Sequence, residues 1–260
     1  MTRAHLEQAP AMLLAAGRGE RMRPLTDDCP KPLLRVHDRP LLEWHLRALA
    51  RAEVPHVVIN TAWHGRKIGE HFGHVFQHEA FHGNRGQLTI YYSNEGLDFG
   101  RALETAGGIT RALPRLAPIF WLAAADVFAP DFDFDVSHVR RFRSADALAH
   151  LWLVPNPEHH PRGDFGLAPD GRALNLADTD PRERSTYSTM ALLRAELFEP
   201  PWCAIARGNP EGVSAPLAPL LRRAMDAGRV TAELYRGRWV DVGTPQRLAW
   251  ANARPLAPAG

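Results

Sequence analysis

Residues 14–26 read LAAGRGERMRPLT, and a second short stretch, Pro30-Lys31-Pro32-Leu33, follows closely. Apolar residues lead directly into a loop with glycines and arginines, an arrangement in which a strand brings backbone N–H groups and cations to a polyphosphate. Among 31 basic side chains, only Lys31 and Lys67 are lysines. A lysine between two prolines, in a chain that otherwise uses arginine, indicates a site that needs a compact point charge. The stretch therefore predicts a strand followed by a phosphate-binding loop.

Two common glycine-rich patterns do not describe this loop. The dinucleotide-binding pattern needs a third glycine where this chain has Met22, and the Gly-Lys-Ser/Thr end of the P-loop is absent. A purely structural strand-to-helix turn is the alternative. Such a turn has no need of Arg18, Arg21, Arg23 and Lys31 so close together. We therefore favour phosphate binding over a plain turn.

Composition limits the classes of function. The 260 residues are 45% hydrophobic and 23% charged, as in an ordinary soluble protein, and a net charge of +2 gives no general attraction to nucleic acid or anionic membrane. No run approaches the roughly 18 apolar residues of a membrane span. Cys29 and Cys203 lack metal-type spacing, and the N-terminus has no signal-peptide pattern. We expect a cytoplasmic protein whose anion binding is local.

The first half alternates predicted strands and helices. Apolar periodicity predicts strands at 12–16, 54–60, 88–92 and 119–125, and helices at 41–52 and 104–113. A strand, a crossover helix and a second apolar strand form a βαβ unit, so we expect a parallel sheet. Ligand sites in such sheets lie at the carboxyl ends of strands. Gly17 and Asp126 each follow a predicted strand and are therefore expected at one site.

The second half is less regular. Strands are predicted at 147–154 and 187–193, a hairpin at 166–176, two strands joined at Gly237 (230–235 and 238–242), and helices at 216–227 and 245–251. We find no internal repeat and no polar linker between the halves. One domain spanning residues 1–260 is expected.

Two aspartates follow apolar strands in different halves of the chain. Asp126 ends Ala123-Ala124-Ala125-Asp126, and Asp241 lies in Trp239-Val240-Asp241-Val242. A carboxylate at such a position is costly to desolvate unless it holds a cation or pairs with a base. Magnesium accepts one or two carboxylates together with substrate phosphates. The pair predicts a magnesium site, with ordinary strand-end or helix-capping aspartates as the alternative.

Histidines are unusually frequent in two segments. Residues 156–165 read NPEHHPRGDF, which favours a ligand-facing loop over a plain surface loop. The other segment has near-helical spacing that could suggest a metal site, and its histidines are His71, His74, His78 and His82. Glycines interrupt this second segment and no cysteine joins it, so we expect a solvated insertion over residues 71–86.

In these residues the chain resembles the sugar-phosphate nucleotidyltransferases, which join a nucleoside triphosphate to a sugar 1-phosphate and release pyrophosphate. The matching stretches are 14–33, Leu103-Glu104-Thr105-Ala106-Gly107-Gly108, the strand ending at Asp126, and residues 239–244. They occur in the family's order over nearly the whole chain. Within the family, residues 156–165 and 235–244 most resemble the bacterial N-acetylmuramic acid 1-phosphate uridylyltransferases of cell-wall recycling.

The resemblance implies an α/β fold, a Rossmann-like three-layer αβα arrangement around a mixed, mainly parallel central sheet. Residues 11–130 would form a nucleotide-binding half and residues 131–250 a sugar-binding half. The implied partners are small molecules only, a nucleoside triphosphate and a sugar 1-phosphate, without nucleic acid or membrane. The implied cofactor is Mg2+. Whether the protein is a monomer or a homo-oligomer stays open.

The resemblance also implies roles for individual residues. Arg21 and Lys31 would be catalytic, by neutralising phosphate charge. The nucleotide would contact Leu14, Ala16, Gly17, Gly19, Glu20, Arg21, Lys31, Glu104 and Gly107. The sugar phosphate would contact Ala124, Arg162, Gly163, Asp164 and Thr189, with Asp164 hydrogen-bonded to the sugar. Asp126 and Asp241 would hold magnesium.

The chain departs from the family pattern at several positions. Ala124 and Ala125 replace a usual Asn-Gly pair, and Ala106 and Thr189 each stand where relatives have glycine. The lysine that many relatives place against the sugar phosphate is missing from the second half, where Arg162 could substitute.

Three functions compete on this sequence. A uridylyltransferase acting on N-acetylmuramic acid 1-phosphate is favoured. The nearest alternative is the same reaction with GTP and mannose 1-phosphate, or with dTTP and glucose 1-phosphate. A catalytically inactive sensor of nucleotides or sugar phosphates is the third, against which the presence of Lys31, Asp126 and Asp241 argues.

Overall fold

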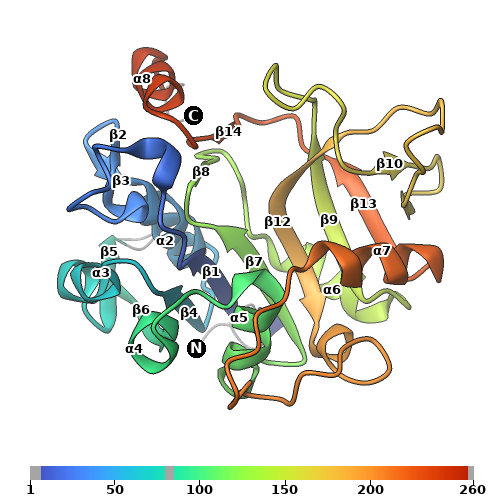
Figure 1. Cartoon of the computed structure of the whole chain (residues 1–260), viewed down its shortest axis with the longest axis horizontal. Helices are drawn as coiled ribbons and strands as arrows, with labels where there is room; N and C mark the ends of the chain where they lie inside the picture. The colour runs from blue at the N-terminus through green and yellow to red at the C-terminus, as the bar shows by residue number, and fades with distance from the viewer. Residues whose placement is uncertain (1–6, 80–84, 257–260) are drawn as a thin grey trace.

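The computed structural model describes residues 7–79 and 85–256 and is built around an eight-stranded sheet (Figure 1). The strand order is β13-β9-β12-β7-β1-β4-β6-β5. The strands are β1 (Ala11–Ala15), β4 (His56–Thr61), β5 (Val75–Glu79), β6 (Arg85–Asn94), β7 (Ile119–Ala124), β9 (Ala149–Val154), β12 (Thr186–Arg194) and β13 (Val230–Leu234). β7, β1, β4 and β6 are mutually parallel, as are β9 and β13, whereas β12 and β5 run antiparallel to their neighbours. The expected mixed, mainly parallel sheet is confirmed.

Short strand pairs and helices complete the fold. The pairs are β2 (Arg35–Val36) with β3 (Arg39–Pro40), β8 (Val127–Phe128) with β14 (Val240–Asp241), and β10 (Gly166–Leu167) with β11 (Ala173–Leu174). The α-helices are α2 (Leu41–Arg51), α3 (Gly65–Phe72), α4 (Glu95–Phe99), α5 (Glu104–Ala112), α6 (Val136–Ser144), α7 (Ala218–Asp226) and α8 (Pro245–Ala253). The 3₁₀ turns are η1 (Glu20–Met22), η2 (Lys31–Leu33), η3 (Leu113–Arg115) and η4 (Ala195–Phe198).

Helices cover both faces of the sheet and give three layers. Successive residues of β1 point to opposite faces: Leu13 packs in a cluster with residues of α2, α3 and α6, whereas Met12 packs in a second cluster with residues of α5 and α7. A third, smaller cluster joins α8 to β8 and β14, and it includes Met22 of the loop after β1. The three-layer αβα arrangement is therefore confirmed.

The crossover helix α2 shows why the sequence folds in this way. Leu42, Leu46 and Leu49 recur at helical spacing and are fully buried against the sheet. Each contributes on the order of 2 kcal/mol of burial free energy. Glu43 and Arg47, one turn apart, form an ion pair of 2.7 Å on the more exposed side. The β1-α2-β4 unit is the predicted βαβ unit, with Leu13 in parallel register with Ile59.

Two expectations change in detail. The strands predicted at 230–235 and 238–242 are shorter, at Val230–Leu234 and Val240–Asp241, and belong to different sheets: β13 pairs with β9 in the main sheet, and β14 pairs with β8. The described part of the insertion expected at 71–86 consists of the end of α3, the edge strand β5 and the start of β6, and His71 on α3 and His74 before β5 are exposed, as expected for a solvated segment. His82 lies outside the described residues. In the described part of the chain, no helix is long and apolar enough to cross a membrane.

A buried polar network fixes the carboxyl ends of β1 and β4. The Glu95 side chain is fully buried and accepts hydrogen bonds of 2.7 Å from the Asn60 amide and from the Leu103 N–H. The Asn60 carbonyl oxygen in turn accepts the N–H of Ala15, at 2.9 Å. Burial raises the pKa of Glu95, while these two donors oppose the rise. A Cβ on Gly108 would lie 2.5 Å from Glu95 Oε1 and 2.9 Å from Asn60 Nδ2, so this helix position must be glycine.

We expect Gly108→Ala to lower the free energy of unfolding by about 2 kcal/mol, because overpacking and a displaced buried hydrogen bond outweigh the better helix propensity of alanine. Gly17→Ala is the matched control, since a Cβ there meets no atom within 4 Å, and its effect should stay within about 0.5 kcal/mol. Urea unfolding followed by circular dichroism measures both. Equal stability of the two variants would contradict the proposed role of Gly108.

Candidate active site

A cavity of about 450 Å³ opens at the carboxyl ends of β1 and β7. This volume falls in the range of small-molecule sites. It is lined by many of the residues expected from the sequence, namely Leu14, Ala16, Gly17, Lys31, Glu104, Ala124, Asp126 and Thr189. Asn60, held by Glu95 as described above, also lines it and was not predicted. An apolar strand that ends in a single buried amide carries no motif that could have identified it.

The Lys31 ammonium is buried in the wall of this cavity. The side chain is 9% exposed, and Nζ lies 2.6 Å from Oδ2 of Asp126, which is 39% exposed. Lys31 begins η2, where Pro30 and Pro32 fix the backbone on both sides. A desolvated ammonium needs a countercharge, so Asp126 stabilises Lys31 in a place where it can also meet a substrate anion.

The segment that carries Asp126 is held from two directions. His45 of α2 is buried, and its Nε2 contacts the Val127 carbonyl oxygen at 2.8 Å. Burial lowers the pKa of His45, so the ring is neutral at pH 7 and donates this bond. From the other side, the Val242 N–H donates to the Asp126 carbonyl oxygen at 3.1 Å.

The pairing of β8 with β14 places the backbone of Asp241 next to the segment that carries Asp126, although Asp241 does not line the described cavity. Asp241 lies opposite Val127, the residue after Asp126, although the two aspartates are far apart in sequence. Figure 1 shows these two short strands as neighbours. Carboxylate oxygens are the ligands that Mg2+ prefers, so the donor chemistry of this pair fits the expected ion.

Asp241 is itself flanked by two cationic or titratable groups. Arg247 Nη1 lies 3.1 Å and His159 Nε2 3.4 Å from Asp241 Oδ2. Burial, followed by the charge of Arg247, lowers the pKa of His159, so this ring is neutral at pH 7. Arg247 is 17% exposed, and its Nε and Nη2 are buried without a hydrogen-bond partner among the described residues. A Cβ on Gly243 would overlap Arg247 Nη2, so the glycine leaves room for the guanidinium in this position.

Arg247 was missed by the sequence analysis. It lies in the first turns of α8, which Thr244 caps by accepting the Arg247 N–H at 3.3 Å. In the sequence, an arginine in a terminal amphipathic helix is typical of a solvated face. The signal that could have indicated it is the glycine two residues after Asp241, which leaves room for a large side chain above the backbone.

Two contacts fix the loop after β1: a hydrogen bond at Gly19 and the burial of Met22. Gly19 has a φ of 65°, and its carbonyl oxygen accepts the Thr26 hydroxyl at 2.8 Å. Met22, at the position where the dinucleotide-binding pattern has glycine, is fully buried in the cluster with β8 and β14. Glu20 and Arg21 are exposed and do not line the described cavity.

The expected sugar-binding loop lies against β12 and outside the lining of the described cavity. Asp164 Oδ2 accepts the Tyr187 N–H at 2.8 Å, and Oδ1 lies 3.1 Å from His160 Nε2. Arg162 is exposed, and Gly163 has a φ of 62°. Asp164 therefore fixes its own loop, and a hydrogen bond that it accepts from the sugar stays a prediction.

Two further predicted residues have clear structural reasons. Thr189 has a φ of 68°, at a register shift between Tyr187 and Ala191, where glycine would be unstrained. Its buried Oγ1 has no hydrogen-bond partner in the described part of the chain, although the residue lines the cavity. Gly107 does not line it: a Cβ there would overlap the Val213 carbonyl oxygen, so this glycine permits close packing.

The chain is similar to known proteins in sequence and in fold. Residues 11–92 match the MobA-like NTP transferase domain. The chain is 42% identical to the N-acetylmuramate alpha-1-phosphate uridylyltransferase of Neisseria meningitidis serogroup B over 94% of this chain and 96% of that protein. It is 31% identical to the enzyme of the same name from Caulobacter vibrioides, over 96% and 98%. The inositol-1-phosphate CTP transferase of T. maritima has a similar fold, with a TM-score of 0.64 at 16% identity over 96% and 98%.

The buried Lys31–Asp126 pair predicts an asymmetry between two substitutions. Asp126→Asn leaves a buried ammonium without its countercharge and should lower the free energy of unfolding by roughly 1–3 kcal/mol. Lys31→Met removes the buried charge, leaves the more exposed Asp126 to water, and should change stability by less than about 1 kcal/mol. Urea unfolding without divalent ions measures both. A larger loss for Lys31→Met would contradict this assignment of the desolvated partner.

Proposed function

Because the chain belongs to the sugar-1-phosphate nucleotidyltransferases, we propose that it joins UTP to N-acetylmuramate 1-phosphate, giving the UDP-sugar and pyrophosphate. The two relatives described above, aligned over nearly their whole length, carry this name and support this substrate pair. The single structural observation that carries the proposal is Lys31 beside Asp126 in the wall of the cavity. In a cell, the reaction would serve peptidoglycan recycling.

The chemistry needs little acid–base catalysis. A phosphate oxygen of the sugar 1-phosphate attacks the α-phosphorus of UTP, the bond from this phosphorus to the bridging oxygen of the β-phosphate breaks, and pyrophosphate leaves. The nucleophile is already an anion, so the main barrier is to align two polyanions. Lys31 would reduce their repulsion from within the cavity wall, and Arg21 of the exposed loop would add charge at its edge.

We propose Asp126 and Asp241 as the residues that hold Mg2+. When bound, the ion would screen the phosphates and stabilise the charge of the departing pyrophosphate. Lys31 contacts Oδ2 of Asp126, so the carboxylate can present Oδ1 to a cation. Arg247 and His159 orient Asp241 from the other side.

Arg247 is our candidate for the sugar-phosphate cation. The second half of the chain has no lysine, and Arg162, the substitute expected from the sequence, is an exposed side chain. Neither Arg162 nor Arg247 lines the described cavity, so the choice rests on burial and free donor groups. Arg247 is largely buried beside Asp241 and keeps donor groups unpaired. A guanidinium with free N–H groups suits a phosphate oxygen.

The remaining expectations are proposals of the same kind. We expect one domain, with the nucleotide over residues 11–130 and the sugar over 131–250, where Thr189, Gly163 and Asp164 would contact it. Cys29 and Cys203 are both unpaired, which suits a cytoplasmic enzyme. Nothing in the cavity indicates the base, so the nucleotide is assigned from the relatives.

The test is pyrophosphate release with Mg2+, measured for UTP, GTP, dTTP and CTP against several sugar 1-phosphates. We expect the highest kcat/KM with UTP and N-acetylmuramate 1-phosphate. A higher value with mannose 1-phosphate or glucose 1-phosphate would reject the substrate. Release from no pair would leave the sensor function instead.

Lys31→Met is expected to reduce kcat strongly in this assay while the melting temperature hardly changes, because the ammonium acts on charge that develops during the reaction. An unchanged rate combined with a large loss of stability would show that Lys31 is structural.

Gly243→Ala tests Arg247 without removing it. The new methyl group should push the flexible guanidinium away from Asp241 and lower kcat/KM by about tenfold to a hundredfold, with little change in melting temperature. Gly69→Ala on α3 is the control, since its Cβ would meet only Tyr92, at 4.0 Å. Full activity of Gly243→Ala would argue against Arg247 as a phosphate ligand.

A further inference from the structure

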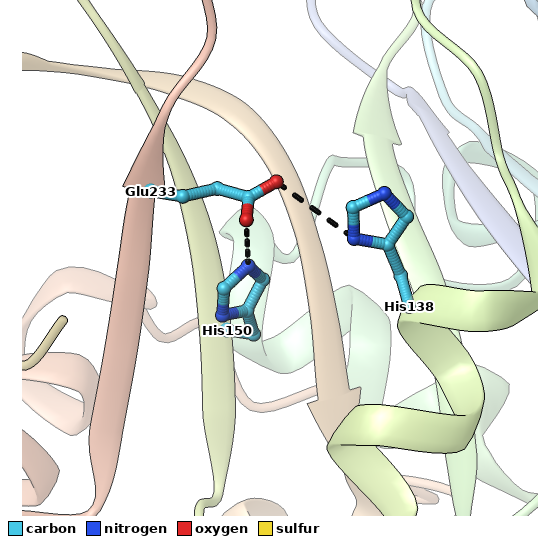
Figure 2. Close-up of side chains that lie close together, drawn as sticks. All are labelled: His138, His150 and Glu233. Atoms are coloured by element: carbon cyan, nitrogen blue, oxygen red, sulfur yellow. Dashed lines mark ion pairs between the residues drawn. The ribbon is translucent and has the colours of Figure 1, made fainter.

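Two histidines and a glutamate converge at the edge of the sheet, outside the cavity described above. Figure 2 shows His138 of α6, His150 of β9 and Glu233 of β13 pointing toward one another. One ligand atom from each lies within 4.8 Å of the other two. His138 Nδ1 is 3.7 Å from Glu233 Oε1, and His150 Nε2 is 3.7 Å from Glu233 Oε2. In the described residues, this is the one group of three or more such side chains that could hold a metal ion.

Regular elements hold all three side chains. In the parallel register of β9 and β13, His150 lies beside Thr231 and Trp152 beside Glu233, so His150 and Glu233 share one face of the sheet. Helix α6 covers this face, and the His138 ring packs edge-on against Trp121 and Trp152. The positions are therefore fixed by backbone pairing and core packing, not by a loop.

Thr231 orients the His150 ring so that Nε2 faces the cluster. The ring Nδ1 lies 2.9 Å from the Thr231 hydroxyl, which can accept from or donate to this nitrogen. The ring Nε2 lies 3.7 Å from Glu233 Oε2 and is buried with no hydrogen-bond partner in the part of the chain that the structure describes, and metal binding would displace a proton held there. Orientation of one ring nitrogen by a neighbouring group is typical of histidines that bind metals.

Glu233 supplies a permanent negative charge. The neighbouring His150 ring lowers the pKa of the Glu233 carboxyl to about 2, and the Trp152 indole N–H donates to Oε1 at 2.7 Å. The carboxylate is therefore ionised and oriented at physiological pH. Burial lowers the pKa of His138, so this ring is neutral and able to bind a cation.

Arg141 marks the third ligand position. Its Nη2 lies 2.7 Å from His138 Nδ1, and because arginine can only donate, Nδ1 carries a lone pair in this contact. The Arg141 guanidinium therefore occupies the place beside His138 Nδ1 that a bound metal ion would take. Arg141 is an exposed side chain, so it can turn into solvent when another cation takes its place.

We propose that His138 Nδ1, His150 Nε2 and a carboxylate oxygen of Glu233 bind a divalent transition-metal ion of the zinc type. Two imidazoles and a carboxylate form a ligand set that zinc uses, whereas magnesium prefers oxygen alone. Tetrahedral bonds of about 2.1 Å place ligand atoms roughly 3.4 Å apart. The histidine nitrogens lie 3.7 Å from Oε1 and Oε2 of Glu233, respectively, and the three ligand atoms lie within 4.8 Å of one another, so binding needs the side chains to draw together. A cavity of about 90 Å³ beside His138 and His150 leaves room for a water as the fourth ligand.

The site is separate from the proposed catalytic centre. β9 runs in the same direction as β7, because both are antiparallel to β12 between them. His150 is the second residue of β9 and so lies near the amino ends of these strands, whereas the active-site cavity lies at the carboxyl ends. The bound ion would tie α6 to the edge strands and stabilise the second half of the chain without entering the reaction.

The test uses the full chain after removal of metals with a chelator. Zn2+ is titrated by calorimetry in the presence of saturating Mg2+, which occupies the carboxylate pair. We expect one Zn2+ per chain and a melting temperature raised by about 5 °C at a free Zn2+ concentration near 100 times the Kd. Co2+ should give the visible absorption of a tetrahedral site. Excess Mg2+ should not displace Zn2+ or Co2+ from the cluster, because magnesium prefers oxygen ligands.

Glu233→Gln and His150→Gln should each abolish this binding, while the matched control His71→Gln, on the exposed face of α3, should retain it. Arg141→Ala should lower the Kd severalfold because it removes the competing cation, and it alters only an exposed side chain. No stoichiometric Zn2+ binding by either the wild type or Arg141→Ala would overturn the proposal. Binding that persists in both Glu233→Gln and His150→Gln would overturn it as well.

Discussion

The contact between the Lys31 ammonium and the Asp126 carboxylate is the interaction on which the site depends. An ammonium with 9% of its side chain exposed is costly to bury alone, so the loop after β1 and the end of β7 must be held together. The backbone after Asp126 then pairs with β14, which brings Asp241 and α8 to the same edge. One buried charge therefore couples the glycine-rich loop, the central strand and the C-terminal helix.

Several glycines leave room for buried polar side chains. Gly108 permits the contact between Glu95 and Asn60, and Gly243 leaves space for the Arg247 guanidinium. In both places a charged or amide group occupies the volume that a methyl group would take. The glycines of the motifs therefore have two reasons to be present: some make room for a polar side chain over the backbone, and those of the loop after β1 are expected to let the backbone approach a phosphate. Of the two glycines in the loop after β1, Gly17 and Gly19, only Gly19 has a left-handed backbone conformation.

Most of the fold could be predicted because its signals are local. The leucines of α2 and the apolar runs of β1 and β7 carry periodicity that a short window of sequence contains. The pairing of β8 with β14 could not, since each strand is two residues long and the partners are far apart in the chain. For the same reason Asp126 and Asp241 could be proposed as partners only from their similar contexts and from the family resemblance, and neither Arg247 nor Asn60 lies in a recognisable motif. His138, His150 and Glu233 are scattered over three elements and form no motif.

β14 lies late in the chain, so the parts of the proposed site are synthesised at different times. During synthesis, the strands and loop of the first half emerge together and can fold around Lys31 and Asp126. Asp241 and Arg247 emerge long afterwards. An incomplete or C-terminally clipped chain would then keep most of the cavity wall yet lack one carboxylate and the adjacent guanidinium. Under the proposed roles, such a fragment would keep Lys31 and Asp126 but lose one carboxylate of the metal site, so catalysis would depend on synthesis of the C-terminal segment.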